Sequence, residues 1–402
     1  MNLRLHIDGE VLGWWWRGGI PRLYAELLPR AAAADPELDL VVSLQGRLSP
    51  HSAGVVPAVR RVPRAEAWRP WRLWRRAAPR LDPWLAARYW RRQAGDVFHP
   101  THYSAPEVDM PSFCFVYDMT PELFPDGFEP GFARRMAERK RRAITRAHRL
   151  LCISENTKRD VMRLLGAPEE KCCVVYLAPF TRAAAGIRLR CESPTTRASA
   201  GQAEPGPASS GGPPSVAAGA EPFLLYVGDF YAPYKQFRFL LQCLGSAEFA
   251  AYRDLRLVVV SSRAPSADEQ REFSALLPAG RLRFVAGASD EELLAHYRRC
   301  AALVYPSLYE GFGMPVLEAL EVGAPVVCPY ASSLPEVAGE TAFYYEAASP
   351  AGLREALGRA LASGRSADAV AARQRRAARF TWEATTAAFI ATAREVAAEG
   401  RP

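Results

Sequence analysis

YPSLYEGFGMPVLE, residues 305–318, is the stretch that decides the fold class, because it has the pattern of a ligand-binding loop between a strand and a helix. An apolar run ending at Val304 predicts a buried strand. Gly311 and Gly313 are free to adopt positive φ and to bring the backbone close to a ligand. Pro315 suits the first turn of the following helix. The N–H groups and the positive dipole end of such a helix start favour an anion such as a diphosphate.

Two glutamates flank this helix start. Glu310 lies just before it and Glu318 lies within it. Carboxylates repel a diphosphate but accept hydrogen bonds from hydroxyls, so we expect one to meet a sugar and the other a ribose. Either glutamate alone would suggest an ordinary solvated loop. Together with the two glycines, the proline and the next apolar run, GAPVVCPY at 323–330, they favour a binding site.

Short apolar runs alternate with helical patterns on both sides of this stretch, which predicts parallel sheets with helices on both faces. Ser289 and Glu292 form a capping box that begins one of the helices. The predicted strands are 3–8, 38–43, 113–117, 150–153, 223–227, 257–261, 282–285, 302–305, 325–328 and 342–345, and the predicted helices include 20–34, 130–147 and 155–165.

Length and composition predict two globular cores. A chain of 402 residues with 49% hydrophobic and 23% charged residues is neither disordered nor built around membrane spans. Residues 183–221 are rich in Ala, Pro, Gly and Ser and predict a flexible linker. The start of the chain has a strand pattern instead of a secretion signal, so a cytoplasmic location is expected. The eight cysteines form no C-x2-C pair, so neither a zinc site nor a redox motif is indicated.

The net charge of +8 is concentrated in one segment, Arg60–Arg92. Interleaved Arg and Trp suit an anionic membrane surface, a nucleic acid or an anionic acceptor. The alternative is that the segment forms helices whose Trp face packs inward while the Arg side chains stay in water. No nucleic-acid-binding module is recognisable, so a nucleic acid is not an expected partner. The tryptophans concerned are Trp68, Trp71, Trp74, Trp84 and Trp90.

Glu310 and Glu318 are separated by seven residues, and this spacing resembles the motif of retaining glycosyltransferases of family four. These enzymes have the GT-B fold and include many bacterial mannosyl-, glucosyl- and galactosyltransferases. The resemblance implies an α/β protein with two Rossmann-like, doubly wound parallel-sheet domains facing a central cleft. It would place an acceptor domain at 1–182, a flexible linker at 183–221, a donor domain at 222–380, and at 381–402 a C-terminal helix that crosses back. Other similar segments are FLLYVGDFYAPYKQF at 223–237, residues 285–347, DVFHPTHYSAP at 96–106, VYDMTPELFP at 116–125, CISENTKRDV at 152–161 and FTWEATTAAFIATARE at 380–395.

The resemblance implies a hexosyltransferase that moves a sugar such as mannose or glucose from a nucleotide-sugar donor to a glycan or lipid-linked acceptor, in cell-envelope polysaccharide assembly. Such a protein would be cytoplasmic, or peripheral at the inner face of the cell membrane. Neither a metal nor another cofactor is expected. By position, the catalytic candidates are Glu310, Lys235 and Asp118. Glu310 would contact the transferred sugar, Glu318 the donor ribose, and Lys235 the departing diphosphate. The other donor-binding candidates are Gly18, Gly19, Gly228, Gly311, Phe312, Gly313 and Met314, and the acceptor-binding candidates are Tyr117, Asp118, His99 and His102.

The sequence departs from the family pattern at two positions. Phe230 replaces an Arg of the leaving-group site, and Tyr117 replaces the His of a His-Asp pair. Arg263 is a candidate substitute for the missing cation. The two departures keep open a second hypothesis, a degenerate GT-B protein that binds a nucleotide sugar or a partner without transfer. For His99 and His102, an ordinary loop pair is the alternative to acceptor binding.

Overall fold

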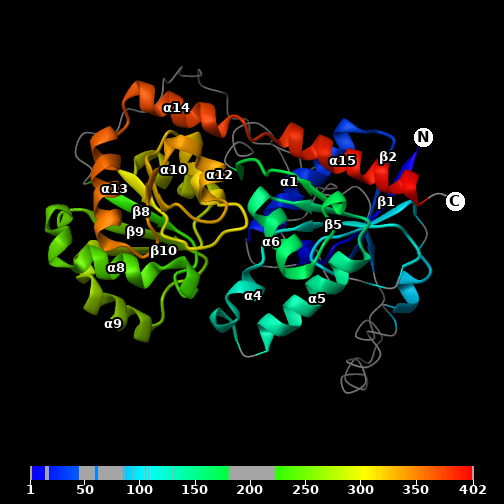
Figure 1. The fold of residues 1–402 in the computed structure, drawn as a ribbon, viewed down its shortest axis with the longest axis horizontal. Coiled ribbons are helices and arrows are strands. Elements are labelled where there is room, and N and C mark those ends of the chain that lie inside the picture. The colour runs from blue at the N-terminus through cyan, green and yellow to red at the C-terminus, as the bar shows by residue number, and fades with distance from the viewer. Residues whose placement is uncertain are drawn as a thin grey trace, which may run out of the picture.

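The computed structural model describes residues 2–13, 18–44, 59–61, 85, 87–93, 95–104, 106, 108–129, 131–180 and 222–400. The predicted linker 183–221 and most of Arg60–Arg92 therefore lie outside the described residues. The described chain folds into two halves that lie side by side, each built on parallel strands (Figure 1).

The N-terminal half contains two parallel sheets that meet edge to edge. One has the strand order β3-β2-β1-β4 and the other β5-β6-β7. A single parallel bridge between Phe98 and Ser112 joins β4 to the segment before β5. The strands are β1 (Leu3–Asp8), β2 (Leu38–Leu44), β3 (Val59–Arg61), β4 (Val97–Pro100), β5 (Phe113–Val116), β6 (Arg149–Cys152) and β7 (Cys172–Val174).

Helices cover both faces of these sheets. Apolar side chains of α1 and α15 pack on one face, and those of α5 and α6 pack on the other. Polar caps set the helix limits: Ser154 Oγ accepts from the backbone N–H of Thr157 at the start of α6. The helices of this half are α1 (Gly19–Ala34), α4 (Thr120–Leu123), α5 (Phe132–Arg146) and α6 (Glu155–Leu165).

The C-terminal half is one six-stranded parallel sheet of order β10-β9-β8-β11-β12-β13. Its helices are divided between the two faces because side chains alternate along each strand: Leu224 and Tyr226 of β8 pack with α8, α9 and α13, whereas Leu225 and Val227 pack with α10, α11, α12 and α14. The strands are β8 (Phe223–Val227), β9 (Arg256–Ser261), β10 (Leu282–Ala286), β11 (Ala302–Val304), β12 (Val326–Pro329) and β13 (Phe343–Tyr345).

The remaining helices are α8 (Phe237–Gly245), α9 (Ala267–Leu276), α10 (Asp290–Arg299), α11 (Met314–Glu321), α12 (Leu334–Ala338), α13 (Pro350–Ser363), α14 (Ala367–Ala377) and α15 (Trp382–Glu399). The predicted strands and helices are all present, with ends within about two residues. The Ser289–Glu292 capping box begins α10 as predicted. The sequence analysis did not predict β3, β4 or β7; in β4, His99 and Pro100 interrupt the apolar pattern.

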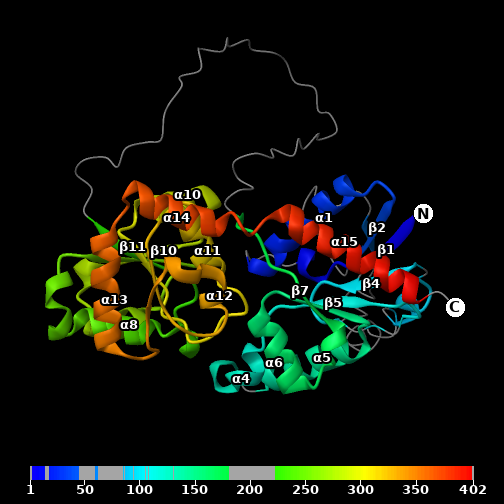
Figure 2. The same cartoon turned by 45° about the horizontal axis from the view of Figure 1, so that its top comes forward.

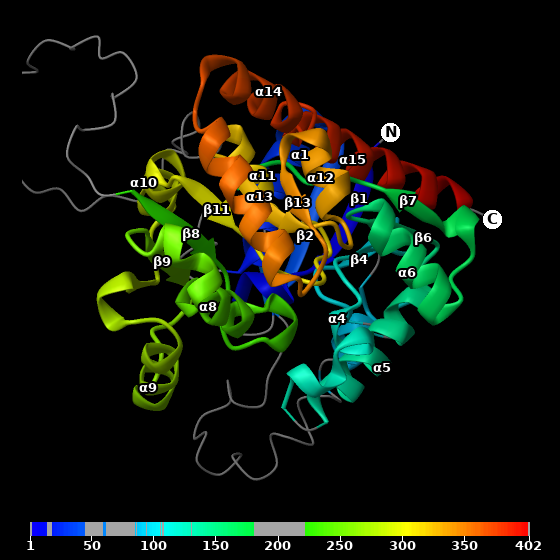
Figure 3. The same cartoon turned by 60° about the vertical axis from the view of Figure 1, so that its left-hand side comes forward.

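Helix α15 returns from the C-terminal half and lies along α1 of the N-terminal half, as Figures 2 and 3 show from two further directions. Phe389 packs its ring against His99, Phe113 and Phe115. Arg394 forms an ion pair with Asp35 of the α1 C-cap at 2.6 Å. The core of the N-terminal half is thus completed by the last described helix.

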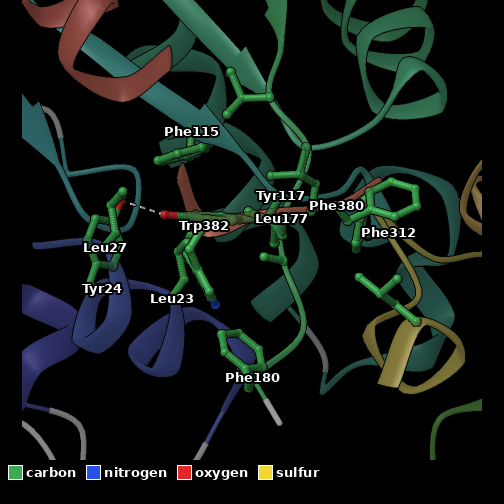
Figure 4. Close-up of a cluster of buried hydrophobic side chains, with 14 of the residues drawn as sticks. Leu23, Tyr24, Leu27, Phe115, Tyr117, Leu177, Phe180, Phe312, Phe380 and Trp382 are labelled. Atoms are coloured by element: carbon green, nitrogen blue, oxygen red, sulfur yellow. Dashed lines mark hydrogen bonds between the residues drawn. The ribbon is translucent and has the colours of Figure 1, made fainter. Parts of the chain in front are cut away.

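A buried aromatic cluster fills the junction of the two halves (Figure 4). Phe312 and Phe380 come from the C-terminal half and meet Tyr176 and Leu177, which follow β7. Trp382 Nε1 donates to the carbonyl of Pro179 at 3.2 Å. No described helix is both long enough and apolar enough to span a membrane.

Candidate active site

The loop between β11 and α11 has the predicted strand-loop-helix form. Gly313 is the N-cap of α11 and takes a φ of 97°, so the expected positive φ is confirmed there. Gly311 does not take a positive φ. A Cβ on Gly311 would instead lie 1.7 Å from the carbonyl oxygen of Tyr117, in the other half of the molecule. Glycine is needed at 311 for close approach between the halves, which corrects the expectation from sequence.

Side chains of the N-terminal half hold this loop in place. The hydroxyls of Ser154 and Thr157, at the start of α6, both donate to the Gly311 carbonyl, at 2.7 and 3.1 Å. The Tyr309 hydroxyl donates to Asp160 Oδ2 at 2.9 Å. The loop that carries Glu310 is therefore positioned by both halves of the chain.

Glu310 and Lys235 form an ion pair, with 2.6 Å between Oε1 and Nζ. Lys235 belongs to the loop after β8, whereas Glu310 follows β11, the strand that neighbours β8 in the sheet. The Tyr305 hydroxyl lies 2.7 Å from the same Glu310 oxygen and 3.2 Å from Lys235 Nζ. The structure thus brings two of the catalytic candidates together and adds Tyr305, which the sequence analysis did not single out.

Glu318 is 2% exposed and lies on the first turns of α11. Its Oε2 accepts a hydrogen bond from the Tyr297 hydroxyl at 2.9 Å. Its Oε1 is buried without a hydrogen-bond partner among the described residues, although Arg22 Nη1 lies 3.7 Å away. Burial raises the pKa of Glu318, and the positive charge of Arg22 partly opposes this shift. One oxygen of this carboxyl group therefore keeps its full capacity to accept a hydrogen bond from a ligand.

Arg22 joins the two halves next to Glu318. It lies on α1, and its Nη2 is 3.3 Å from Asp290 Oδ1 at the start of α10. Its guanidinium lies 4.3 Å from the centre of the Phe180 ring. The sequence analysis did not identify Arg22 and Tyr297, because their contacts with Glu318 depend on the packing of α1 and α10 against α11. The sequence did offer one indication for Arg22, namely its position one turn into the helix that follows the Gly18–Gly19 loop.

The other donor-binding candidates lie at turns around this region. Gly18 is the N-cap of α1 and Gly19 is its first residue. Gly228 directly follows β8 with a φ of 139°, and no described atom lies within 4 Å of a Cβ built at Gly19 or Gly228. Both positions therefore leave room for a ligand to approach the backbone. Phe312 and Met314 flank the N-cap of α11, and Phe312 is buried in the junction cluster.

Asp118 lies after β5 with 38% of its side chain exposed. Its Oδ1 accepts from the Thr120 N–H at 2.9 Å at the start of α4. Lys140, buried in α5, donates to the Asp118 carbonyl at 2.7 Å and to Glu122 Oε2 at 2.8 Å. Asp118 therefore presents a carboxylate that is partly exposed and rigidly held, a suitable arrangement for binding a hydroxyl.

His102 lies near Asp118 and close to the carboxyl group of Glu10. Its Nδ1 is 3.9 Å from Glu10 Oε1, and burial lowers the pKa of His102 to about 4. Arg139 of α5 forms an ion pair with Glu10. Asp8, at the end of β1, accepts from the Glu10 N–H at 2.6 Å, and burial raises the pKa of Asp8 to about 6. The sequence analysis missed Asp8 and Glu10, although Asp8 ends a predicted strand and Glu10 lies two residues beyond it.

Tyr117 and His99 lie in the core, which corrects their assignment as acceptor contacts. The Tyr117 hydroxyl donates to the Thr101 carbonyl at 2.7 Å and lies 2.8 Å from the Tyr24 hydroxyl, the bond drawn in Figure 4. His99 is 0% exposed and its pKa is lowered to about 3 by burial, so the ring is neutral. Its Nδ1 donates to the Phe113 carbonyl at 2.9 Å, and its Nε2 lies 2.8 Å from the Tyr24 hydroxyl. Both side chains are structural.

Phe230 is also a core residue, with 1% exposure. Its ring packs edge-on against Phe273 and Phe284. Arg263 covers that ring from outside, with its guanidinium 4.8 Å from the ring centre. Arg263 is itself bound to Glu269 by two hydrogen bonds of 2.7 Å. In the free protein Arg263 is therefore engaged with Glu269 at the start of α9 and with the aromatic cluster.

The described residues contain no group of three or more His, Cys, Asp or Glu side chains that could hold a metal ion. The absence of a metal requirement stays a prediction.

Two family models match the chain, one in each half. Residues 17–178 match the model described as Glycosyltransferase Family 4, and residues 221–363 match the model described as Glycosyl transferases group 1. The two parallel-sheet halves are those of the GT-B class of glycosyltransferases. The chain belongs to family 4 of the glycosyltransferases, also described as group 1.

Curated relatives are similar over short segments. The chain is 49% identical over 61 residues to the O-antigen chain mannosyltransferase B of Escherichia coli, which is 15% of this chain and 16% of that protein. It is 33% identical over 150 residues to the MMP alpha-(1->4)-mannosyltransferase of Mycolicibacterium hassiacum, 36% of each chain. The matches thus span well under half of the length of these two relatives.

Solved structures match over nearly the whole chain at low identity, which bears on the fold alone. Sucrose-phosphate synthase from Thermosynechococcus elongatus has a TM-score of 0.67 at 16% identity, covering 99% of this chain and 100% of the other. Alr3699/HepE from Anabaena, solved in complex with UDP and glucose, has a TM-score of 0.64 at 14% identity, covering 97% and 99%.

Proposed function

We propose that this protein is a retaining glycosyltransferase that moves a hexose from a nucleotide-sugar donor to a glycan or lipid-linked acceptor. The observation that carries the proposal is the buried Glu318 carboxyl, whose Oε1 lacks a hydrogen-bond partner among the described residues. A buried acceptor without a partner costs about 1–3 kcal/mol, which a ligand hydroxyl would recover. The hydroxyl proposed here is that of the donor ribose.

The start of α11 suits the diphosphate of the donor. Backbone N–H groups around Phe312, Gly313 and Met314 lie at the positive end of the helix dipole. Lys235 supplies a full positive charge from the neighbouring loop. In the free protein its partner is Glu310, so a bound diphosphate would compete with this carboxylate for the ammonium group. Glu310 would then be free to accept hydrogen bonds from the sugar.

Asp118 and His102 are the proposed acceptor contacts. Asp118 is partly exposed and fixed by the cap of α4, and His102 is uncharged near neutral pH because burial lowers its pKa. A carboxylate and a neutral imidazole both bind sugar hydroxyls well. Retention through substitution on one face of the sugar, with the leaving phosphate helping to deprotonate the acceptor, is the mechanism that this family suggests.

Mannose is the first sugar to test, since the relatives named above are mannosyltransferases. The same proposal includes a role in cell-envelope polysaccharide assembly and membrane contact through Arg60–Arg92. It also includes the domain limits 1–182, 183–221, 222–380 and 381–402. The separation of the sheets of the N-terminal half from the sheet of the C-terminal half and the return of α15 support these domain limits.

The test begins with a thermal-shift panel of UDP-, GDP-, ADP- and TDP-sugars. A donor that binds only the folded state raises the melting temperature by mass action. The stabilising donor is then used in a transfer assay that measures nucleoside diphosphate release with candidate acceptors, and the anomeric configuration of the product is determined by NMR. Inversion would contradict a retaining enzyme, and the absence of stabilisation by every donor would contradict the site.

The degenerate protein that binds a nucleotide sugar or a partner without transfer stays the alternative. It depends on Phe230 and Tyr117, and both side chains are buried in the core, so neither supplies the polar group that the family pattern has at its position. Donor turnover in the transfer assay would exclude it.

A further inference from the structure

Two buried polar atoms without hydrogen bonds lie close together at the junction of the two halves. One is Nη2 of Arg22, on α1 of the N-terminal half, and the other is Oε1 of Glu318, on α11 of the C-terminal half. Neither atom has a hydrogen-bond partner among the described residues. The first is a donor and the second an acceptor. Buried polar atoms without partners are costly, so the pair marks a place for a ligand group that can both donate and accept.

The direct contact between the two side chains is too long to satisfy them. Arg22 Nη1 lies 3.7 Å from Glu318 Oε1, beyond the range of about 2.7–3.2 Å of an N–H···O hydrogen bond. Arg22 Nη2 lies 3.3 Å from Asp290 Oδ1, and this contact is an ion pair without a hydrogen bond. By contrast, the ion pair that α15 makes with the N-terminal half, between Arg394 and Asp35, is 2.6 Å long. The contact between Arg22 and Glu318 therefore leaves room for a hydroxyl to complete it.

Packing holds the guanidinium of Arg22 in place. It lies 4.3 Å from the centre of the Phe180 ring, a favourable cation–π contact. The ring is itself 3% exposed and packs against Trp382, with 5.7 Å between the ring centres; Figure 4 shows both aromatic side chains. The position of the guanidinium is thus fixed while its Nη2 atom stays available to a ligand.

The start of α1 leaves space for that ligand. Gly19 lies one turn before Arg22 and therefore on the same side of the helix. No described atom lies within 4 Å of a Cβ built at Gly19. The side chain of Arg22 is 23% exposed, whereas that of Glu318 is 3% exposed. A ligand that lies along the start of α1 can therefore reach the guanidinium first and the carboxyl group behind it.

We infer that Arg22 is a specificity-determining residue, which binds one hydroxyl of the donor ribose together with Glu318. The hydroxyl would donate to Glu318 Oε1 and accept from Arg22 Nη2, so both buried atoms gain their missing partner. This inference rests on the proposed function, in which Glu318 alone contacts the ribose, and it adds a contact from the opposite half of the chain. A deoxyribose that lacks this hydroxyl would leave both atoms unpaired, so the site would reject the corresponding deoxynucleotide.

The test is isothermal calorimetry with UDP, GDP and ADP and with the 2′-deoxy and 3′-deoxy forms of each. We expect the unaltered chain to bind a ribonucleotide roughly 10–100 times more tightly than at least one of its deoxy forms, the usual effect of a hydrogen bond to a charged group. Arg22→Met keeps an apolar stem over Phe180 but removes the donor, so this discrimination should largely disappear. Arg22→Gln, which is shorter and uncharged, is measured in the same way and keeps the test decisive if Arg22→Met folds poorly.

The matched control is Arg30→Met, on the same helix. Arg30 is 21% exposed, pairs with Glu26, and has its guanidinium 5.3 Å from the ring centre of Trp382. It therefore resembles Arg22 in burial, charge pairing and aromatic contact, but it does not contact Glu318. We expect Arg30→Met to keep the full preference for the ribonucleotide.

Three results would overturn this inference while the nucleotide site stands. The first is equal affinity of the unaltered chain for a ribonucleotide and both of its deoxy forms. The second is full discrimination in the Arg22 variants, which would leave Glu318 as the sole contact of the ribose. The third is an equal loss of affinity for all forms in these variants, which would make Arg22 only a brace between the halves. Binding of none of the three ribonucleotides would instead contradict the proposed function, and the inference with it.

Discussion

The backbone of Gly311 passes so close to the carbonyl oxygen of Tyr117 that a Cβ at residue 311 would lie 1.7 Å from it. These two residues are almost two hundred positions apart and follow strands of different sheets, β5 and β11. Their approach sets the spacing of the two halves at the point where Glu310 and Asp118 face the proposed substrates.

Gly311→Ala is expected to force the halves apart locally. Overpacking of this kind typically costs about 1–3 kcal/mol and displaces the backbone. We therefore expect lower stability in urea unfolding and reduced turnover in the transfer assay. Gly280→Ala is the matched control, because no described atom lies within 4 Å of its Cβ position and its φ is ordinary. Wild-type turnover in Gly311→Ala would show that the loop can shift without consequence.

Lys235→Ala should reduce turnover about 10²–10³-fold. This is the usual effect of removing one positioned hydrogen-bond donor that stabilises the negative charge developing in the transition state. Tyr305→Phe removes a hydrogen bond to Glu310 but no charge, so its effect should be smaller. Lys158→Ala, a partly exposed lysine of α6, serves as the control. The measurement is nucleoside diphosphate release with donor and acceptor. Unchanged turnover in Lys235→Ala would remove this residue from the leaving-group site.

Glu318→Ala should weaken nucleotide binding by roughly 2–4 kcal/mol, since a hydrogen-bonded charged group is lost and a cavity remains. Isothermal calorimetry is done with the nucleoside diphosphate and with inorganic pyrophosphate, which lacks the nucleoside. The comparison separates the contribution of the ribose and base from that of the phosphates. Glu321→Ala, one turn further along α11, is the control. An equal loss of affinity in both variants would indicate a general disturbance of the helix.

Asp8 predicts a pH dependence of stability. Its pKa is raised from 3.8 to about 6 by burial, and Glu10 adds to the shift. Between these two values the folded state binds more protons than the unfolded state, so the free energy of unfolding falls as the pH rises from about 4 to 6. The fall from this one group is at most about 3 kcal/mol. Asp8→Asn should remove it, whereas Asp254→Asn on the surface should not, and urea unfolding across this pH range measures both.

Phe230→Arg should destabilise the C-terminal half. From the family pattern alone one expects that this change restores a cation and raises turnover. The structure reverses that expectation, because Phe230 is enclosed by Phe237, Phe273 and Phe284 and a buried charge there would lack a partner. We expect a loss of about 3–5 kcal/mol in unfolding experiments. Tyr330→Arg, at an exposed aromatic of the same half, is the control, and a stable, more active Phe230→Arg would refute the core assignment.

The sequence predicted what depends on local pattern. Apolar runs located β8 and β11, the capping box located α10, and the glycine-rich loop located Glu310 and Glu318. Each of these signals lies within a stretch of some ten residues, where periodicity, caps and turn residues act.

The remaining features depend on packing between distant segments. Nothing near Phe230 in the sequence shows that its ring enters an aromatic cluster instead of the site. His99 and His102 share one short segment, and strand alternation together with α15 buries only the first of them completely. The approach of Arg22 to Glu318 likewise requires α1 and α11 to be brought together by the whole fold.

The return of α15 bears on the order in which the protein can fold during synthesis. The N-terminal half leaves the ribosome first, yet the aromatic surface of His99, Phe113 and Phe115 is covered only when Phe389 emerges. Until then this half must expose an apolar groove, the kind of surface that chaperones bind in nascent chains. The N-terminal half can therefore complete its folding only after the C-terminal half has been translated.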